Sequence, residues 1–254
     1  MSEGAPKTAL ITGAARRIGR EIASALAADG WAVGVHYHSS VHEAQAVVED
    51  ITAKGGKAAA FKADLAREDN VQGLIPRVVA ELGPLGCLIN NASLFEDDST
   101  RTATRQSWDQ HMETNLRAPF VLSQGFTGQL PPGASGNIIN ILDQRVWNLT
   151  PRFTSYTLSK SALWSLTQIM AMNLAPEIRV NAIGPGPTLP SIHQSEQDFA
   201  RQWQSMPLKR AVDLSEISAA VRFILDAPSM TGQMIALDAG QHLGWAPGGG
   251  RIDE

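Results

Sequence analysis

The sequence predicts an α/β fold: a doubly wound parallel sheet with helices on both of its faces. Apolar segments of strand length alternate with segments whose apolar residues recur at helical spacing, from residue 8 to residue 237. The strand segments are almost continuously apolar, as is usual for strands buried on both faces of a parallel sheet. Short connections favour right-handed crossovers between the repeated strand–helix units. Because no linker or change in composition divides the chain, residues 1–254 are expected to form a single domain.

The elements follow one another in a regular order. The first strand, at 8–12, precedes a helix at 18–29 in which Ile18, Ile22 and Leu26 share one face. The later strands are expected at 32–37, 58–63, 85–91, 137–142, 178–183 and 234–237. The later helices are expected at 41–54, at about 68–82, at 106–128, from the region of Tyr156 to about 174, and at 214–225. The segment at about 185–212 is rich in Pro, Gly, Ser and Gln, which is typical of a substrate loop or lid.

Composition excludes several classes of function. The net charge of −4 gives no basic surface for nucleic acid, and the chain has no apolar run of the roughly 18 residues that span a membrane. The N-terminal residues lead directly into the first strand, without the apolar core of a signal peptide. The single cysteine, Cys87, excludes an internal disulfide and suits a cytoplasmic location. The histidines are scattered, so no metal site is expected.

Two residues at helical spacing, Tyr156 and Lys160, are the first candidates for catalysis. Residues i and i+4 share one helix face, so the ammonium can lie beneath the phenol. A free phenol has a pKa of about 10, and a cation within about 4–6 Å lowers that pKa. The two residues could also be an ordinary surface pair. Asp143, thirteen residues before Tyr156, is a further acid–base candidate.

The first strand-to-helix turn, residues 12–19, has the pattern of a dinucleotide site. Gly13 allows a tight turn, Gly19 allows the helix to pack closely, and the helix N-terminus presents amides to a pyrophosphate. An NAD site carries an acidic residue about twenty residues later, but residues 36–40 are His-Tyr-His-Ser-Ser. Arg16 and Arg17 could instead meet the 2′-phosphate of NADP(H), or they could be solvated arginines at a helix start. NADP(H) is therefore the expected cofactor.

Several motifs occur together in order along the chain. They are Thr12-Gly13 with Gly19, Asp64, Asn90-Asn91-Ala92, Asn115, Tyr156-x-x-x-Lys160 and Arg179-Val180-Asn181 followed by Gly184-Pro185-Gly186. With them the chain resembles the short-chain dehydrogenase/reductase family over nearly its whole length. The resemblance implies a Rossmann-like domain with a seven-stranded parallel sheet, usually assembled as a homotetramer.

The resemblance also implies roles for single residues. Tyr156 is the implied proton donor, Lys160 holds the nicotinamide ribose, and Asn115 anchors a water below the lysine. Asp64 is implied to contact adenine, and Asn91 to brace the cofactor. The other cofactor contacts that the resemblance implies are Ile18, Leu65, Ala92, Pro185 and Gly186.

Four departures from the common family pattern are informative. Arg17 replaces the middle glycine of the turn, Ser93 follows Ala92 where glycine is usual, Phe95 comes two positions later, and Asp143 replaces a serine. Together they resemble the pteridine reductase branch, which includes dihydromonapterin-type reductases. That resemblance implies that Arg17 and Ser93 reach cofactor phosphate and pterin, and that Phe95 sandwiches the pterin against nicotinamide. It also implies that Asp143 shares proton delivery with the tyrosine.

The end of the second strand resembles the same branch with one difference. His38, Ser39 and Ser40 are implied to contact the cofactor, but Ser39 stands where the branch has an arginine for the 2′-phosphate. Discrimination between NADP and NAD then depends on Arg16, Arg17 and Ser40.

An aspartate at position 143 changes the chemistry that is expected. An ionised carboxylate would repel the alkoxide that develops when a ketone is reduced. A pterin C=N accepts hydride at carbon and a proton at nitrogen, so Asp143 could relay protons from water to Tyr156. The carboxylate could instead cap the strand end or pair with Arg145, and Phe95 could simply pack at the rim of the site.

The sequence therefore predicts an NADPH-dependent reductase of a pterin-like C=N substrate, of the dihydropteridine or dihydrofolate type. The alternative is a carbonyl reductase of the same family, acting on a ketone or a 3-oxoacyl group. A non-catalytic NADP-binding sensor is a third and less favoured interpretation, since it has no need for Asn115, Tyr156 and Lys160. The expected ligands are small molecules, with no nucleic acid and no membrane.

Overall fold

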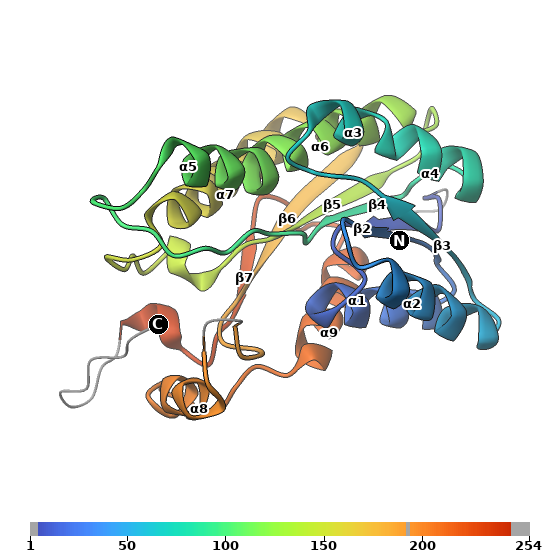
Figure 1. Ribbon diagram of the computed structural model, residues 1–254. Helices are drawn as coiled ribbons and strands as arrows, with labels where there is room; N and C mark the ends of the chain where they lie inside the picture. Colours follow the sequence, from blue (N-terminus) through green and yellow to red (C-terminus); the bar gives the residue numbers. More distant parts are fainter. Residues whose placement is uncertain (1–4, 192–193, 245–254) are drawn as a thin grey trace.

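The computed structural model describes residues 5–191 and 194–244 of the chain. Within these residues seven strands form one parallel sheet in the order β3-β2-β1-β4-β5-β6-β7, which confirms the fold class predicted from the sequence (Figure 1). The strands are β1 (Thr8–Ile11), β2 (Ala32–Tyr37), β3 (Lys57–Lys62), β4 (Cys87–Asn90), β5 (Gly136–Ile141), β6 (Ile178–Pro185) and β7 (Met234–Leu237). The order reverses between β1 and β4, and open α/β sheets bind ligands beyond the strand ends at such a point.

Helices cover the sheet on both faces (Figure 1). One face carries α1 (Arg17–Ala28), α2 (Val41–Ala53) and α9 (Leu214–Asp226). The other face carries α3 (Glu68–Gln72), α4 (Leu74–Leu82), α5 (Arg105–Met112), α6 (Ala118–Gln129) and α7 (Thr154–Asn173). α8 (Glu196–Gln204) lies apart from both layers. Among the described residues, no helix combines the length and the apolar character needed to cross a membrane.

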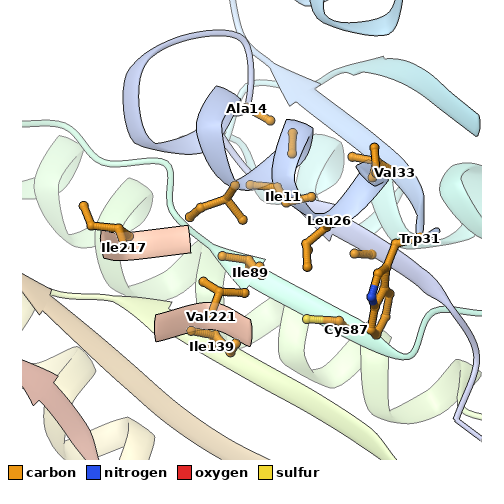
Figure 2. Packing of buried hydrophobic residues seen from close by; sticks show 14 of the residues in the cluster. Ile11, Ala14, Leu26, Trp31, Val33, Cys87, Ile89, Ile139, Ile217 and Val221 are labelled. Carbon is orange, nitrogen blue, oxygen red and sulfur yellow. The ribbon is translucent and has the colours of Figure 1, made fainter. Parts of the chain in front are cut away.

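The core consists of two main apolar layers, one on each face of the sheet. Because successive residues of a strand point to opposite faces, neighbours in β1 belong to different layers. Ile11 packs in the layer that contains Leu26 of α1 and Val221 of α9 (Figure 2), whereas Leu10 packs in the other. Cys87 of β4 is buried in the first of these layers, where burial raises the pKa of its thiol to about 12. A thiol that stays protonated contributes packing and no nucleophile.

Three helical regions differ from the boundaries that the sequence predicts. The helix expected at 68–82 is two helices, α3 and α4, separated at Gly73. The helix expected at 106–128 consists of α5, a π-helical segment η1 (Glu113–Arg117) and α6, since a single wide turn interrupts the helix without disturbing its apolar pattern. The loop expected at 185–212 contains α8, whose capping box joins Ser195 and Asp198. Its polar composition is what suggested a loop.

Candidate active site

A cavity of about 570 Å³ lies beyond the carboxyl ends of the central strands. Its walls come from the turn after β1, the segment after β4, the ends of β5 and β6, and α7. The site residues predicted from the sequence that line it are Arg17, Ile18, Asn91, Ser93, Phe95, Asp143, Tyr156, Lys160, Pro185 and Gly186. The lining also includes Gln144, Arg152 and Phe153, which the sequence had not assigned to the site. Leu189 and Gln202 in the lining come from the segment at 185–212, for which the sequence predicts a substrate loop.

Tyr156 and Asp143 meet across this cavity. Tyr156 lies in the first turn of α7 and its hydroxyl donates a hydrogen bond to Asp143 Oδ2 at 2.9 Å. The other carboxylate oxygen accepts from the backbone N–H of Arg145 at 2.8 Å, and so caps the short 3-10 helix η2 (Gln144–Val146). Asp143 was expected either to cap the strand end or to be the partner of the tyrosine. It makes both kinds of contact, one with each carboxylate oxygen.

Lys160 lies one turn after Tyr156 with its ammonium inside the fold. Its Nζ donates to the carbonyl of Ile141 at 2.8 Å and lies 6.0 Å from the centre of the tyrosine ring. Burial lowers the pKa of Lys160 to about 8, and the negative charge of Asp143 opposes that shift. At neutral pH the ammonium is therefore still mostly charged, and it lies beside the tyrosine ring.

Asn115, at the centre of the π-helical segment, joins two walls of the cavity. Its side-chain oxygen accepts from the N–H of Leu94 at 2.8 Å, and its amide donates to the carbonyl of Leu94 at 3.0 Å. The same amide donates to Ser159 Oγ on α7 at 3.1 Å. Asn115 thus ties the segment after β4 to the helix of Tyr156, and its expected contact with a water stays a prediction.

The turn after β1 is closed by contacts with the end of β4. The Thr12 hydroxyl accepts from the N–H groups of Asn91 and Ala92, both at 2.9 Å, and the Asn91 amide donates to the carbonyls of Thr12 and Gly13. A Cβ at Gly19 would lie 2.3 Å from the Gly13 carbonyl oxygen, so only glycine fits there. In the described structure the first turn of α1 has no side-chain cap and no acidic residue. Such a turn fits the diphosphate of a dinucleotide.

His36, at the end of β2, supports this turn from below and was not predicted as a site residue. Its Nδ1 accepts from the N–H of Gly13 at 2.9 Å, and its Nε2 lies 3.2 Å from the carbonyl of Ala63, to which it donates. Burial lowers the pKa of His36 to about 4. A neutral imidazole with its proton on Nε2 satisfies both contacts. The signal available in the sequence is a histidine near the end of an otherwise apolar strand.

The two arginines of the turn have different partners. Arg16 is exposed and pairs with Glu43 of α2. Arg17 has a positive φ of 52° and donates to the carbonyls of Leu189 and Pro190, at 3.2 Å and 2.8 Å. Arg17 therefore connects the cofactor turn to the segment at 185–212, which the sequence did not predict.

The remaining predicted cofactor residues lie along the edge next to this turn. His38 and Ser39 are exposed at the end of β2, and Ser40 precedes α2. His38 Nε2 lies 3.9 Å from Asp64 Oδ2. Leu65, the residue after Asp64, is buried. Among the described residues, no three His, Cys, Asp or Glu side chains form a group that could hold a metal ion.

Aromatic rings form a further part of the cavity wall. Phe95 stacks on Phe153 with ring centres 4.3 Å apart, and meets Tyr156 edge to face at 4.7 Å. The Arg145 guanidinium lies 5.1 Å from the centre of the Phe153 ring. Ser93 donates to the Asn115 side chain at 3.4 Å. Packing of Phe95 on another side chain is therefore observed, and its stacking on a substrate ring stays a prediction.

The sheet order, the glycine turn and the Tyr156–Lys160 pair at one cavity are those of a dinucleotide-dependent oxidoreductase. The sequence matches the family model described as short chain dehydrogenase over residues 7–200. The chain therefore belongs to the short-chain dehydrogenase family, as its motifs predict.

Similar proteins include both a 3-oxoacyl reductase and an alternative dihydrofolate reductase. The 3-oxoacyl-[acyl-carrier-protein] reductase FabG of Staphylococcus epidermidis is 35% identical over 242 residues, which cover 93% of this chain and 99% of that protein. The crystal structure of FolM alternative dihydrofolate reductase 1 from Brucella canis, complexed with NADP, has a TM-score of 0.89 and 45% identity, covering 94% of this chain and 95% of that one. A short chain dehydrogenase from Burkholderia cenocepacia, in complex with NADP, has a TM-score of 0.87 and 32% identity, covering 94% and 99%. The cofactor in both structures agrees with the one predicted here.

Proposed function

We propose that this chain is an NADPH-dependent reductase that transfers hydride to a pterin-like C=N bond, of the dihydropteridine or dihydrofolate type. The observation that carries the proposal is the 2.9 Å hydrogen bond from the Tyr156 hydroxyl to Asp143. Reduction of C=N consumes a proton at nitrogen, and a carboxyl group beside the tyrosine can deliver one. A carboxylate at this point disfavours the alkoxide of ketone reduction. The 45% identity to the FolM reductase with bound NADP supports the same choice.

The residues that would hold the cofactor are those of the turn and the cavity floor. The start of α1 offers backbone N–H groups to the diphosphate, with Asn91 fixing the turn at Gly13 and Lys160 facing the cavity. When bound, NADPH supplies the hydride. Arg17 at the cavity edge adds a positive charge near the expected phosphates.

Three side chains would manage the proton. Tyr156 delivers a proton from its hydroxyl to the substrate nitrogen, and the buried ammonium of Lys160 stabilises the negative charge left on the phenol oxygen. Asp143 is half-buried at the cavity wall, so it can take up a proton from water and return it to Tyr156 along their hydrogen bond. Phe95, whose ring packs on Phe153 and meets Tyr156 in a T-shaped contact, would be the surface on which a flat ring substrate stacks.

The test is a substrate panel with an Asp143→Ser variant. Wild-type protein is expected to oxidise NADPH with dihydropterin and to act poorly on ketones and 3-oxoacyl thioesters. Asp143→Ser should lower pterin turnover and raise ketone turnover, because it replaces a proton carrier by a neutral donor. Asp109→Ser, which removes a surface carboxylate paired with Arg105, is the matched control and should change neither. NADPH oxidation with ketones alone would contradict the pterin assignment.

A carbonyl reductase is the second candidate, and the 35% identity to the 3-oxoacyl reductase favours it. In that case Asp143 would serve mainly as the cap of η2, through its hydrogen bond from Arg145. Asp143→Ser would then leave turnover of the 3-oxoacyl substrate unchanged or improved, with no pterin turnover in either protein.

For the assembly we propose a homotetramer, the state that the family resemblance implies. Sedimentation velocity tests it, with four chains of 27.2 kDa as the expected mass. A cytoplasmic location is proposed because the free thiol of Cys87 suits a reducing compartment.

A further inference from the structure

A cluster of buried polar side chains lies directly behind the aromatic wall of the cavity. Asp98 comes from the segment after β4, His111 from α5 and Ser155 from the first turn of α7, and their exposed fractions are 4%, 0% and 0%. None of the three lines the cavity among the described residues. Hydrogen bonds among buried polar groups make the structure around them rigid, so this cluster restrains the three segments that carry it.

The hydrogen bonds of the cluster determine the tautomer of His111. The backbone N–H of Glu96 points at His111 Nε2 at 3.2 Å, so Nε2 is the acceptor. Nδ1 therefore carries the proton and donates to Ser155 Oγ at 2.7 Å. Ser155 in turn donates its hydroxyl proton to Asp98, and its backbone N–H donates to the same carboxylate at 3.0 Å. In a catalytic triad the histidine lies between the serine and the aspartate. Here the serine lies between the other two, so the cluster does not activate Ser155 as a nucleophile.

The cluster fixes the two aromatic residues that face each other in the site. Phe95 precedes Glu96 in the chain, and Tyr156 follows Ser155. His111 accepts from the backbone beside the first ring and donates to the side chain beside the second. The rings of Phe95 and Tyr156 meet at 4.7 Å with their planes 80° apart. A neutral imidazole supplies both the acceptor and the donor that this bridge requires.

We propose that His111 is a positioning residue of the substrate site, which sets the place of Phe95 relative to Tyr156 and thereby selects for flat heterocyclic substrates. The inference rests on the proposed function, because stacking on Phe95 matters for a pterin ring. A 3-oxoacyl chain has no ring to orient, so its binding does not depend on this bridge. His111 acts through Phe95 and takes no part in the proton transfer.

Two substitutions separate the halves of the bridge. Glutamine at 111 reaches about as far as Nε2 and keeps an acceptor for the Glu96 N–H, whereas asparagine reaches about as far as Nδ1 and keeps a donor for Ser155. His111→Gln should keep the KM for dihydropterin within about threefold of wild type, and His111→Asn should raise it about tenfold or more. The KM for NADPH should stay unchanged in both. Equal pterin KM values for His111→Asn and wild type would overturn the proposal.

A double-mutant cycle tests whether the effect passes through Phe95. In a Phe95→Leu background, His111→Asn should raise the pterin KM no further, because the ring that it positions is gone. Full additivity of the two substitutions would show that His111 acts elsewhere, and would also overturn the proposal.

Hydrogen exchange distinguishes this inference from the proposed function. The amide of Glu96 should exchange slowly in wild type and His111→Gln and faster in His111→Asn, whatever substrate the enzyme uses. If wild type reduces no dihydropterin but the exchange pattern holds, the proposed function fails while the positioning of the Phe95 segment stands. Equal exchange of this amide in all three proteins would remove the positioning role itself.

Discussion

At the scale of single residues, the site depends on Asp143 having two oxygens. One accepts from the Tyr156 hydroxyl and the other from the backbone N–H of Arg145. A serine at this position offers one hydroxyl, so it cannot cap η2 and hold the tyrosine in the same way. A substitution at position 143 therefore changes proton delivery and loosens η2 at the same time. A variant that removes proton delivery but keeps Asp143 separates the two effects.

Tyr156→Phe is such a variant. The phenyl ring keeps the contact with Phe95, whose centre lies 4.7 Å away, while the hydroxyl that reaches Asp143 is lost. Turnover should fall by about 10²–10⁴-fold, the range for the loss of one acid–base group. NADPH oxidation in steady state measures the fall, and the dissociation constant of NADPH should be unchanged. Turnover close to wild type would remove Tyr156 from the proton path.

The residue-scale features that escaped prediction are contacts between distant parts of the chain. Helical spacing placed Lys160 beside Tyr156, because four residues on a helix fix the geometry locally. The contact of Arg17 with Leu189 spans 172 residues, and no local pattern determines it. His36 contacts Gly13 only because β1 and β2 are neighbours in the sheet.

At the scale of elements, the start of α1 and the segment after β6 form one unit through Arg17. Its guanidinium donates to two successive carbonyls, those of Leu189 and Pro190. Burial lowers the pKa of this arginine from its usual value. A guanidinium group stays protonated in proteins, so the link is a charged one. Charged donors make the stronger hydrogen bonds. The cofactor turn and the segment that covers the cavity are thereby coupled.

Arg17→Ala should loosen this coupling without changing the backbone preference at position 17, since both residues carry a Cβ at the same positive φ. We expect faster hydrogen exchange in residues 188–191 and a several-fold rise in the KM for NADPH. Arg16→Ala is the matched comparison for the exchange measurement, because Arg16 pairs with Glu43 instead. If both variants exchange at the rate of wild type in this segment, Arg17 does not restrain it.

The sequence predicted the strands better than the helix boundaries. A buried parallel strand leaves an apolar run that is visible by itself, as in β5, where every residue is buried. The π-helical turn that places Asn115 keeps the surrounding apolar spacing, so one long helix was expected in its place. The sequence of α8 is mostly polar, a composition that predicts a loop, although Ser195 and Asp198 carry a capping signal.

At the scale of the whole molecule, the buried titratable side chains include two histidines in addition to Lys160. His36 and His111 are both buried, and burial lowers the pKa of each. A buried neutral histidine makes stability depend on pH, because the unfolded chain can bind a proton that the folded chain refuses. Acidification therefore lowers the free energy of unfolding through both histidines.

His36 should make the larger measurable contribution, and its sign follows from its pKa of about 4 in the folded protein. Carbonyl contact with Ala63 opposes this lowering, whereas the nearby charges of His38 and Arg77 add to it. Unfolded histidine has a pKa of about 6.5, so between about pH 6.5 and 4 the unfolded state holds more protons and the free energy of unfolding falls with acidification. The contribution is present in full above pH 6.5 and, at about 1.4 kcal/mol per pKa unit, amounts to roughly 3 kcal/mol lost by pH 4.

Urea unfolding of wild type and His36→Gln between pH 4 and 7.5 measures this contribution. Glutamine does not titrate, so the variant should be less stable at pH 7.5 but should lose stability more slowly on acidification, and the two curves should converge toward pH 4. The difference between the curves cancels the carboxylates and His111, which titrate in both proteins. Parallel curves across the range would mean that His36 is protonated in the folded state near its ordinary pKa. Its Nδ1 could not then accept the Gly13 N–H on which the shape of the cofactor turn depends.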